Sequence, residues 1–295
     1  MLKTTTKSKR NYYIVGLIML IFFVISFLSN IIGPLVPDII KGFHLSLTLV
    51  AVLPFAFFIA YGVMSIPAGM LNEKYKEKKV MTAAFVVSFA GALLLALFPN
   101  YLTAVVSLFL IGCGMAMLQV VINPLLRTSG GEEHYAFNSV LAQLIFGLAS
   151  FISPLVYSYL VLNLAETNSK DPVQNIFSSI VPQSLPWISL YWLFAVISLV
   201  MVVVILVSRF PKVELNKDEK AGAMQIHLDL LKKPIVLLFF IGIFCYVGTE
   251  QGVANWISQY LYEYHQYDPQ TIGAKAVAYF WGLMTAGGIL GLLLL

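Results

Sequence analysis

The sequence contains little charge: of its 295 residues, 18 are lysine or arginine and 14 are aspartate or glutamate, together 11%. An ordinary globular domain has about 25% charged and roughly 45–50% apolar residues. Here 59% of the residues are hydrophobic and the mean hydropathy is +0.86. This composition excludes a cytosolic enzyme, a disordered tail and a nucleic-acid-binding domain. Lipid is the solvent that it fits.

Groups for metal or disulfide chemistry are equally scarce. The only two cysteines, Cys113 and Cys245, lie far apart inside apolar runs, so we expect them to be packing groups rather than a pair. No His-Glu-x-x-His motif occurs. The four histidines all lie in or beside expected loops: His44, His134, His227 and His265. We therefore expect no metal site, no cofactor and no catalytic residue.

Long apolar runs dominate the chain instead. Eight of them are bounded by charges, prolines or polar turns: 12–35, 50–71, 80–98, 102–126, 138–164, 186–208, 234–260 and 276–295. A membrane-spanning helix needs about 20 apolar residues, and these runs are too uniformly apolar for barrel strands. The first run exceeds a signal-peptide core and lacks a cleavage site, so we expect it to be retained. The sequence predicts an all-α polytopic transmembrane bundle with eight spans.

Basic residues are distributed unevenly between the two sets of loops. Fifteen precede the first run or follow the second, fourth and sixth, whereas only Lys41, Lys170 and Lys275 fall on the opposite side. Lysine and arginine are retained in cytoplasmic loops. The sequence therefore predicts a multi-pass protein of the plasma (inner) membrane with a cytoplasmic N-terminus.

The charged stretch 209–233 divides the chain, because the segment after it begins again with a basic flank and an apolar run. The polar pair Ser29-Asn30 in the first run is echoed by Thr249-Glu250 in the seventh. Such an echo predicts parallel repeats: an N-terminal six-helix bundle at 1–208, a cytoplasmic linker at 209–233 and the start of a C-terminal bundle at 234–295. The last run ends at Leu295 without a flanking charge, so we expect about four more spans to follow.

One acidic residue of the fourteen, Glu250, lies inside an expected span, and the other thirteen fall in loops or at span ends. A carboxylate at membrane depth costs about 2.5–3.5 kcal/mol on insertion scales, which binding of a proton or cation offsets. Glu250 is therefore our candidate for coupling to H⁺ or Na⁺. The alternative is a protonated side chain that hydrogen-bonds a neighbouring helix.

Amide side chains recur in several spans, and on the seventh they repeat every four residues, which places them on one helix face. Amides both donate and accept hydrogen bonds and aromatic rings stack on sugar C–H faces, so this set suits a neutral monosaccharide. The alternative for each amide is hydrogen bonding between helices. The candidate substrate-binding residues are Asn30, Gln119, Asn123, Gln143, Gln251, Asn255 and Trp256, with Gln259 and Tyr260 beside the last three.

The stretch 69–79, GMLNEKYKEKK, resembles the loop between the second and third helices of the major facilitator superfamily, where acidic and basic residues latch the inward gate. Gly69, Glu73 and Lys74 stand at the positions that this resemblance makes gating residues. Four more segments are similar to the fucose/glucose/galactose symporter family within that superfamily: IPAG at 66–69, LQVVINP at 118–124, LAQ at 141–143 and FCYVGTE at 244–250.

This resemblance implies a twelve-span fold of which eight spans are present. It also implies secondary active transport of a neutral monosaccharide by alternating access, coupled to a proton or sodium gradient. Proton-coupled fucose carriers place an acid in the first and fourth spans, where this chain has Asn30 and Gln119, so Glu250 remains the coupling candidate. We expect a monomer whose partners are the sugar and the lipid bilayer, with no nucleic acid. The alternatives are a membrane-embedded enzyme and a non-transporting sugar sensor or scaffold.

Overall fold

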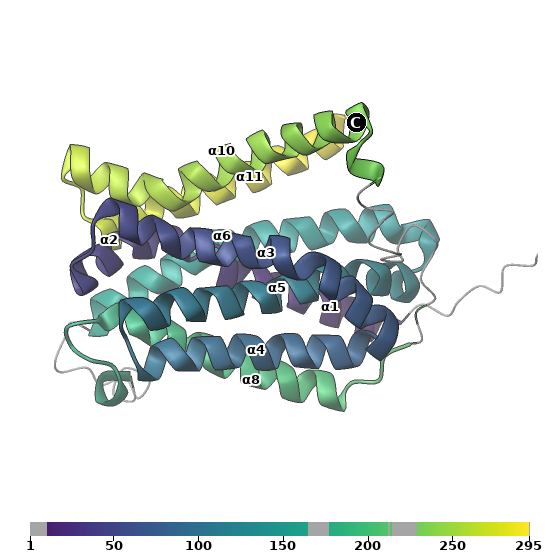
Figure 1. Ribbon diagram of the computed structural model, residues 1–295, viewed down its shortest axis with the longest axis horizontal. Coiled ribbons are helices and arrows are strands. Elements are labelled where there is room, and N and C mark those ends of the chain that lie inside the picture. Colours follow the sequence, from purple (N-terminus) through teal and green to yellow (C-terminus); the bar gives the residue numbers. More distant parts are fainter. Residues whose placement is uncertain (1–10, 165–176, 212, 214–228, 295) are drawn as a thin grey trace, which may run out of the picture.

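The computed structural model describes residues 11–164, 177–211, 213 and 229–294, and this part of the chain contains helices and no strand. The all-α prediction is confirmed. The long helices run side by side along the longest dimension of the molecule (Figure 1). They are α1 (Tyr12–Ser29), α2 (Ile32–Phe43), α3 (Leu47–Tyr75), α4 (Glu77–Leu97), α5 (Tyr101–Gly130), α6 (Tyr135–Leu164), α8 (Ser189–Val207), α10 (Pro234–His265) and α11 (Ala274–Leu294), with short helices η1 (Glu132–His134), η2 (Pro186–Ile188) and η3 (Pro269–Gly273).

Seven helical segments in the described ranges are long and apolar enough to cross a membrane. They are Tyr12–Phe43, Leu47–Tyr75, Glu77–Leu97, Tyr101–Gly130, Glu132–Leu164, Pro186–Val207 and Pro234–His265. The helix α11 occupies the eighth predicted run but is not one of these seven. The count of eight spans therefore stays a prediction.

The first span is broken, which differs from the continuous run predicted at 12–35. Helix α1 ends at Ser29 and α2 begins at Ile32, so Asn30 and Ile31 separate them. The physical reason lies in Pro34, which has no N–H to donate to the carbonyl of Asn30 four residues earlier. The chain then continues as a helix to Phe43, beyond the predicted end.

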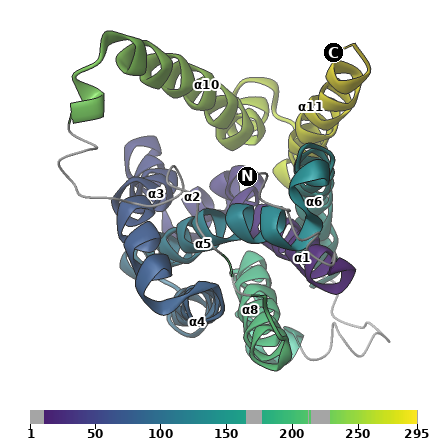
Figure 2. The same cartoon turned by 90° about the vertical axis from the view of Figure 1, so that its right-hand side faces the viewer.

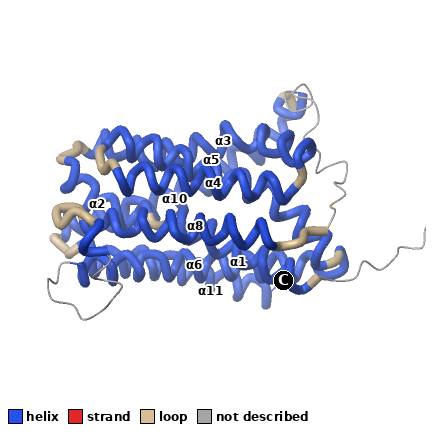
Figure 3. The backbone as a smooth tube through the Cα atoms, turned by 90° about the horizontal axis from the view of Figure 1, so that it is seen from below, coloured by secondary structure: helices blue, strands red, loops and turns tan. Residues whose placement is uncertain are grey.

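Local polar residues set several helix starts. The side chain of Asn100 accepts a hydrogen bond from the backbone N–H of Thr103 at 3.0 Å, and Thr103 Oγ1 accepts one from the Asn100 N–H at 3.2 Å. This reciprocal capping box begins α5. Ser46 caps α3 by accepting from the N–H of Leu49 at 3.3 Å. Apart from the break at Asn30 and Ile31, the connections between the long helices lie at the two ends of the bundle (Figure 3).

The helices before and after the predicted linker form two unequal groups. In the first group α5 packs against α1, α3 and α4, while α8 packs on α4 and α6 packs on α1. In the second group α10 contacts α2 and α11 contacts α6, and both stand apart from α4 and α8 (Figures 1 and 2). Residues 214–228 of the predicted linker and the basic residues before Asn11 lie outside the described part of the chain.

Candidate functional site

Helix α10 has two unlike halves. Residues 234–249 are exposed, apart from the half-buried Val236. The second half contains four buried residues: Ala254, Asn255, Ser258 and Gln259. Because α10 contacts α2 and η3, it packs on the rest of the protein mainly through this second half.

Glu250 lies where the exposed half of α10 meets the buried half, and it is itself half-buried. Its Oε1 accepts a hydrogen bond from Nε2 of Gln251 at 3.3 Å, and Tyr246 hydrogen-bonds to it from one turn earlier. Both partners are neutral, and within the described ranges no lysine or arginine forms a salt bridge with Glu250. The carboxylate therefore remains available to a proton or a small cation.

The amides of α10 follow Glu250 along the helix as the four-residue spacing predicts. Asn255 Nδ2 donates to the main-chain oxygen of Gln251 at 2.8 Å. Gln259, one turn later, is buried, and its Oε1 accepts no hydrogen bond from any described residue. Trp256 is half-buried against the main hydrophobic core. This row of polar groups thus runs from a half-exposed carboxyl to a buried amide.

The other predicted amides lie on α5 and α6. Gln119 is half-buried, and its main-chain oxygen accepts a hydrogen bond from Nδ2 of the exposed Asn123 at 3.3 Å. Gln143 on α6 is exposed. In the part of the chain that the structure describes, the side chains of Gln119 and Gln143 form no hydrogen bond, so their donors and acceptors are available to a ligand.

Asn30, at the break in the first span, joins two helices. Its Nδ2 donates to Ser150 Oγ of α6 at 2.8 Å and to Ser26 Oγ at 3.3 Å, and it is only 8% exposed. The two serine hydroxyls lie 2.7 Å apart. The amide nitrogen of Asn30 therefore forms a hydrogen bond between helices, which was the alternative to sugar binding for each amide. Its side-chain oxygen remains available to a ligand.

The structure does not join the candidate residues into one hydrogen-bonded cluster. Among described residues, the bonds of Glu250 and Gln251 stay within α10, and those of Gln119 and Asn123 stay within α5. Asn30 alone is linked to another helix. A single cavity lined by all of these amides therefore stays a prediction.

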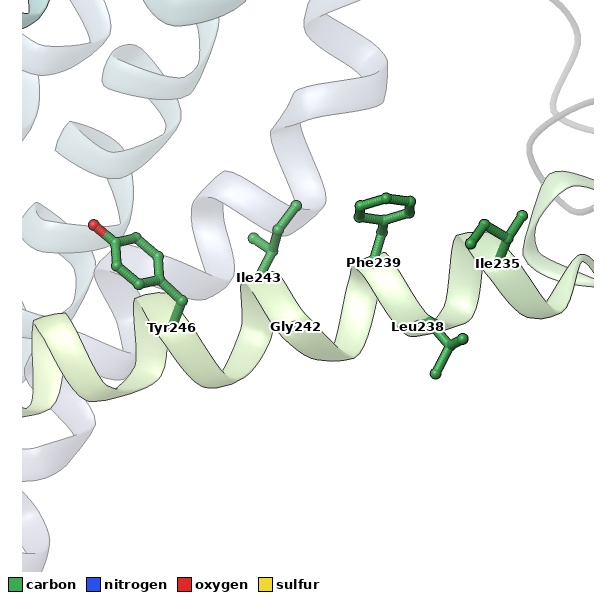
Figure 4. A pocket seen from close by; sticks show the side chains of 6 residues that line it. All are labelled: Ile235, Leu238, Phe239, Gly242, Ile243 and Tyr246. Carbon is green, nitrogen blue, oxygen red and sulfur yellow. The ribbon is translucent and has the colours of Figure 1, made fainter. Parts of the chain in front are cut away.

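A separate cavity of about 330 Å³ lies on the exposed half of α10 (Figure 4). One helix supplies all its lining residues: Ile235, Leu238, Phe239, Gly242, Ile243 and Tyr246. Figure 4 shows Phe239, Ile243 and Tyr246 pointing to the same side of this helix. Sugar sites need several convergent polar groups. The Tyr246 hydroxyl is the one polar side-chain group here, so we do not assign the cavity to the substrate.

Two of the predicted gating residues, Glu73 and Lys74, lie in a helix and not in a loop, which corrects the sequence analysis. Helix α3 extends to Tyr75, so Gly69, Glu73 and Lys74 belong to its last two turns. Lys76 alone separates α3 from α4, and its positive φ of 71° reverses the chain within one residue. Glu73 and Lys74 are exposed, and Lys74 Nζ lies 5.1 Å from the Tyr75 ring centroid. Their gating role stays a prediction.

The sequence analysis missed Asp38, which it placed at a span end. Asp38 lies inside α2, where its Oδ2 accepts a hydrogen bond from the hydroxyl of Tyr157 at 2.6 Å. Nε2 of Gln270 lies 3.3 Å from both carboxylate oxygens. Asp38 thus links α2, α6 and η3, which come from both sides of the predicted linker. The apolar residues that resume at Ile39 were the sequence signal that the helix continues.

Replacing Tyr157 by phenylalanine should lower the free energy of unfolding by about 1.5–3 kcal/mol, because it removes a hydrogen bond to a charged acceptor. We expect Asp38→Asn to show a similar loss and the double variant to lose less than the sum of both. Thermal unfolding in detergent measures these losses. Tyr159→Phe, at an exposed tyrosine of the same helix, is the control. Additive losses from Tyr157 and Asp38 would contradict a shared interaction.

The two groups of helices approach each other closely where α2 crosses α10. A Cβ added at Gly33 would collide with the main-chain oxygen of Ala254 and lie 3.2 Å from the Cα of Asn255. A second close approach joins α6 to α11, where a Cβ at Gly147 would collide with the Thr285 side chain. Small residues at such crossings let membrane helices pack backbone to backbone.

Comparison with known proteins gives a consistent picture. The sequence model of the Major Facilitator Superfamily matches residues 18–295. The glucose/galactose transporter of Brucella abortus biovar 1 (strain 9-941) is 28% identical, over 98% of this chain and 69% of its own length. The L-fucose-proton symporter of Escherichia coli (strain K12) is 25% identical, over 86% of this chain and 61% of its own length.

Solved structures share the fold. A bacterial homolog of the human lysosomal transporter Spinster, in an inward-facing and unoccupied conformation, superposes with a TM-score of 0.74 at 16% sequence identity. The match covers 90% of this chain and 58% of that protein. The chain therefore spans between 58% and 69% of the length of these three proteins.

Proposed function

Because the chain belongs to the Major Facilitator Superfamily, we propose that it carries a neutral monosaccharide of the glucose, galactose or fucose class across the membrane by secondary active transport. The superfamily consists of non-enzymatic transporters, so the membrane-enzyme alternative is dropped. The observation that carries this proposal is similarity to sugar transporters over 98% of the chain. A non-transporting sensor or scaffold is not favoured, because the matched relatives are described as transporters.

The polar groups of α10 support this class of substrate. Glu250, Gln251 and Asn255 present a carboxyl and two amides at the point where α10 leaves the first group of helices. Gln119, Asn123 and Gln143 add hydrogen-bonding groups that no described residue occupies, apart from the Asn123 nitrogen. Amides that both donate and accept suit sugar hydroxyls, which do the same. We assign substrate recognition to six side chains and to the side-chain oxygen of Asn30; the six are Gln119, Asn123, Gln143, Gln251, Asn255 and Trp256.

We propose that the two groups of helices are the moving bodies, with 1–208 as the N-terminal bundle, 209–233 as a cytoplasmic linker and 234–295 as part of the C-terminal bundle. Their contacts, at Gly33 with Ala254 and through Asp38 with Gln270, support a closed end there. Helices α10 and α11 diverge from the other helices away from that end (Figure 1). This closed end lies at the far end of the first span from the N-terminus. If the N-terminus is cytoplasmic, the structure is closed to the outside and therefore inward-facing.

The proposed coupling residue is Glu250, with a proton as the coupling ion. The support is its half-buried carboxyl without a salt bridge among the described residues, together with the matched proton symporter of fucose. The proposed mechanism uses no prosthetic group. Protonation and sugar binding both shift the equilibrium between the inward-facing and the outward-facing conformation. We further propose that the protein acts as a monomer in the inner membrane, since both groups of helices come from one chain.

Uptake by proteoliposomes tests this function. The complete gene product is reconstituted, and D-glucose, D-galactose and L-fucose are offered under separately imposed proton and sodium gradients. We expect an inward proton gradient to drive accumulation of at least one sugar and a sodium gradient to drive none. Saturable sugar binding without uptake would instead favour a sensor, and accumulation driven by sodium alone would overturn the assigned ion.

A further inference from the structure

A large cavity, of about 750 Å³, opens at the end of the bundle where α3 turns into α4. Its walls come from that turn, from α4 and from α8. Helices α4 and α8 form the layer farthest from α10 and α11 (Figures 1 and 2). The cavity is therefore remote from the residues that we assign to the sugar, and it faces the surroundings of the bundle.

One end of this cavity is strongly basic. Lys76, Lys78 and Lys79 line it together with Lys74. Lys78 is fixed in place, because its Nζ donates to the main-chain oxygen of Leu206 at 2.7 Å and to that of Ser208 at 2.9 Å. Lys76 and Lys79 are exposed and form no salt bridge with a described residue. Their charges are available to an anion.

The acids near this basic end leave it positive. Glu77, the first residue of α4, is only 4% exposed and does not line the cavity. Glu73 is exposed in the last turns of α3 and does not line it either. Four lysines therefore line a space to whose wall no described carboxylate contributes.

The rest of the cavity wall is mainly apolar, and on α4 it extends further along the helix than the lysines do. Ala83, Val86 and Leu206 line it, and Val86 and Leu206 are 47% and 54% exposed. Val86 follows Lys79 by two helical turns within a membrane-spanning segment. The cavity thus joins lysines at the end of α4 to apolar side chains of a segment that is long and apolar enough to cross a membrane.

We propose that this cavity is a binding site for one anionic phospholipid. The phosphate lies against the ammonium groups of Lys76, Lys78 and Lys79, and an acyl chain lies along Val86 and Leu206. Basic pockets between membrane helices bind anionic headgroups through charge-assisted hydrogen bonds. The volume is in the range of about 300–1,000 Å³ that ligand sites occupy. A neutral sugar would leave the lysine charges without a counter-charge, and a soluble phosphate would gain nothing from the apolar wall.

Native mass spectrometry of the detergent-purified protein, titrated with single lipids, tests this site. We expect one dioleoylphosphatidylglycerol to be retained more tightly than dioleoylphosphatidylcholine. The double variant Lys76→Gln/Lys79→Gln should bind it roughly 25-fold more weakly, at about 1 kcal/mol for each lysine. The matched double variant Lys232→Gln/Lys233→Gln removes the same charge from another basic segment, and we expect it to bind within about twofold of the unaltered protein.

A second variant probes the apolar wall without changing charge. Val86→Trp should fill this part of the cavity and weaken phosphatidylglycerol retention, while a monodisperse elution profile shows that the protein is folded. Equal losses in both lysine double variants would show general attraction between charges and overturn the site. Inorganic phosphate that displaces the lipid at equal concentration would overturn the lipid assignment, as would undiminished retention by Val86→Trp.

Discussion

Replacing Glu250 by glutamine is expected to abolish sugar accumulation driven by a gradient and to leave sugar exchange within about threefold of its normal rate. Glutamine keeps an oxygen that can accept from Gln251 and Tyr246, so the local geometry is preserved. It can neither release a proton nor pair with a cation. The ratio of labelled sugar inside and outside proteoliposomes should therefore fall to about 1 under an imposed proton gradient, while counterflow of preloaded sugar persists.

Glu263→Gln is the matched control for this variant, because Glu263 is an exposed carboxylate on the same helix. The control should accumulate sugar as the unaltered protein does. Normal accumulation by Glu250→Gln would remove Glu250 from the coupling mechanism. Loss of exchange together with accumulation would instead place Glu250 in sugar binding, since exchange needs no net movement of the coupling ion.

Much of the fold could be predicted from apolar runs, because lipid penalises any charged interruption of a span. The ends of the helices were less predictable. The run at 12–35 does not reveal that Pro34 breaks the helix at Asn30, because hydropathy ignores backbone hydrogen bonds. The lysines after Asn72 indicate a loop, yet Lys76 with a positive φ is enough to turn the chain, and the helix retains Glu73 and Lys74.

Contacts along one helix were also predictable, whereas contacts between helices were not. A four-residue spacing places Gln251 and Asn255 on one face of the helix, and the Asn255 amide then reaches the main-chain oxygen of Gln251. The spacing does not predict that the amide nitrogen of Asn30 donates to Ser150, because that pairing depends on how α1 crosses α6. Asp38 was missed for the same reason: its partner Tyr157 lies more than a hundred residues away, and pattern analysis treats an acid between prolines and a lysine as a loop residue.

Gly33→Ala is expected to have the second large effect, because it adds one methyl group where the two groups of helices touch. The new Cβ would collide with the main-chain oxygen of Ala254, which cannot move as a flexible side chain does. Overpacking of this kind costs about 1–3 kcal/mol. This is enough to shift the equilibrium between the inward-facing and outward-facing conformations about 5- to 150-fold. The closed arrangement at this end should lose population, and the rate of transport should fall about tenfold or more.

Distances between spin labels measure this shift directly. Labels on Lys41→Cys and Tyr264→Cys, both at exposed positions, report the separation of α2 from the end of α10 after Cys113 and Cys245 are replaced by serine. Gly62→Ala is the control, since a Cβ there meets nothing within 4 Å while the gain in helix propensity is the same. A longer distance in the Gly33 variant alone is the expected result. Unchanged distances and unchanged transport would show that the contact between α2 and α10 does not stabilise the conformation that is closed to the outside.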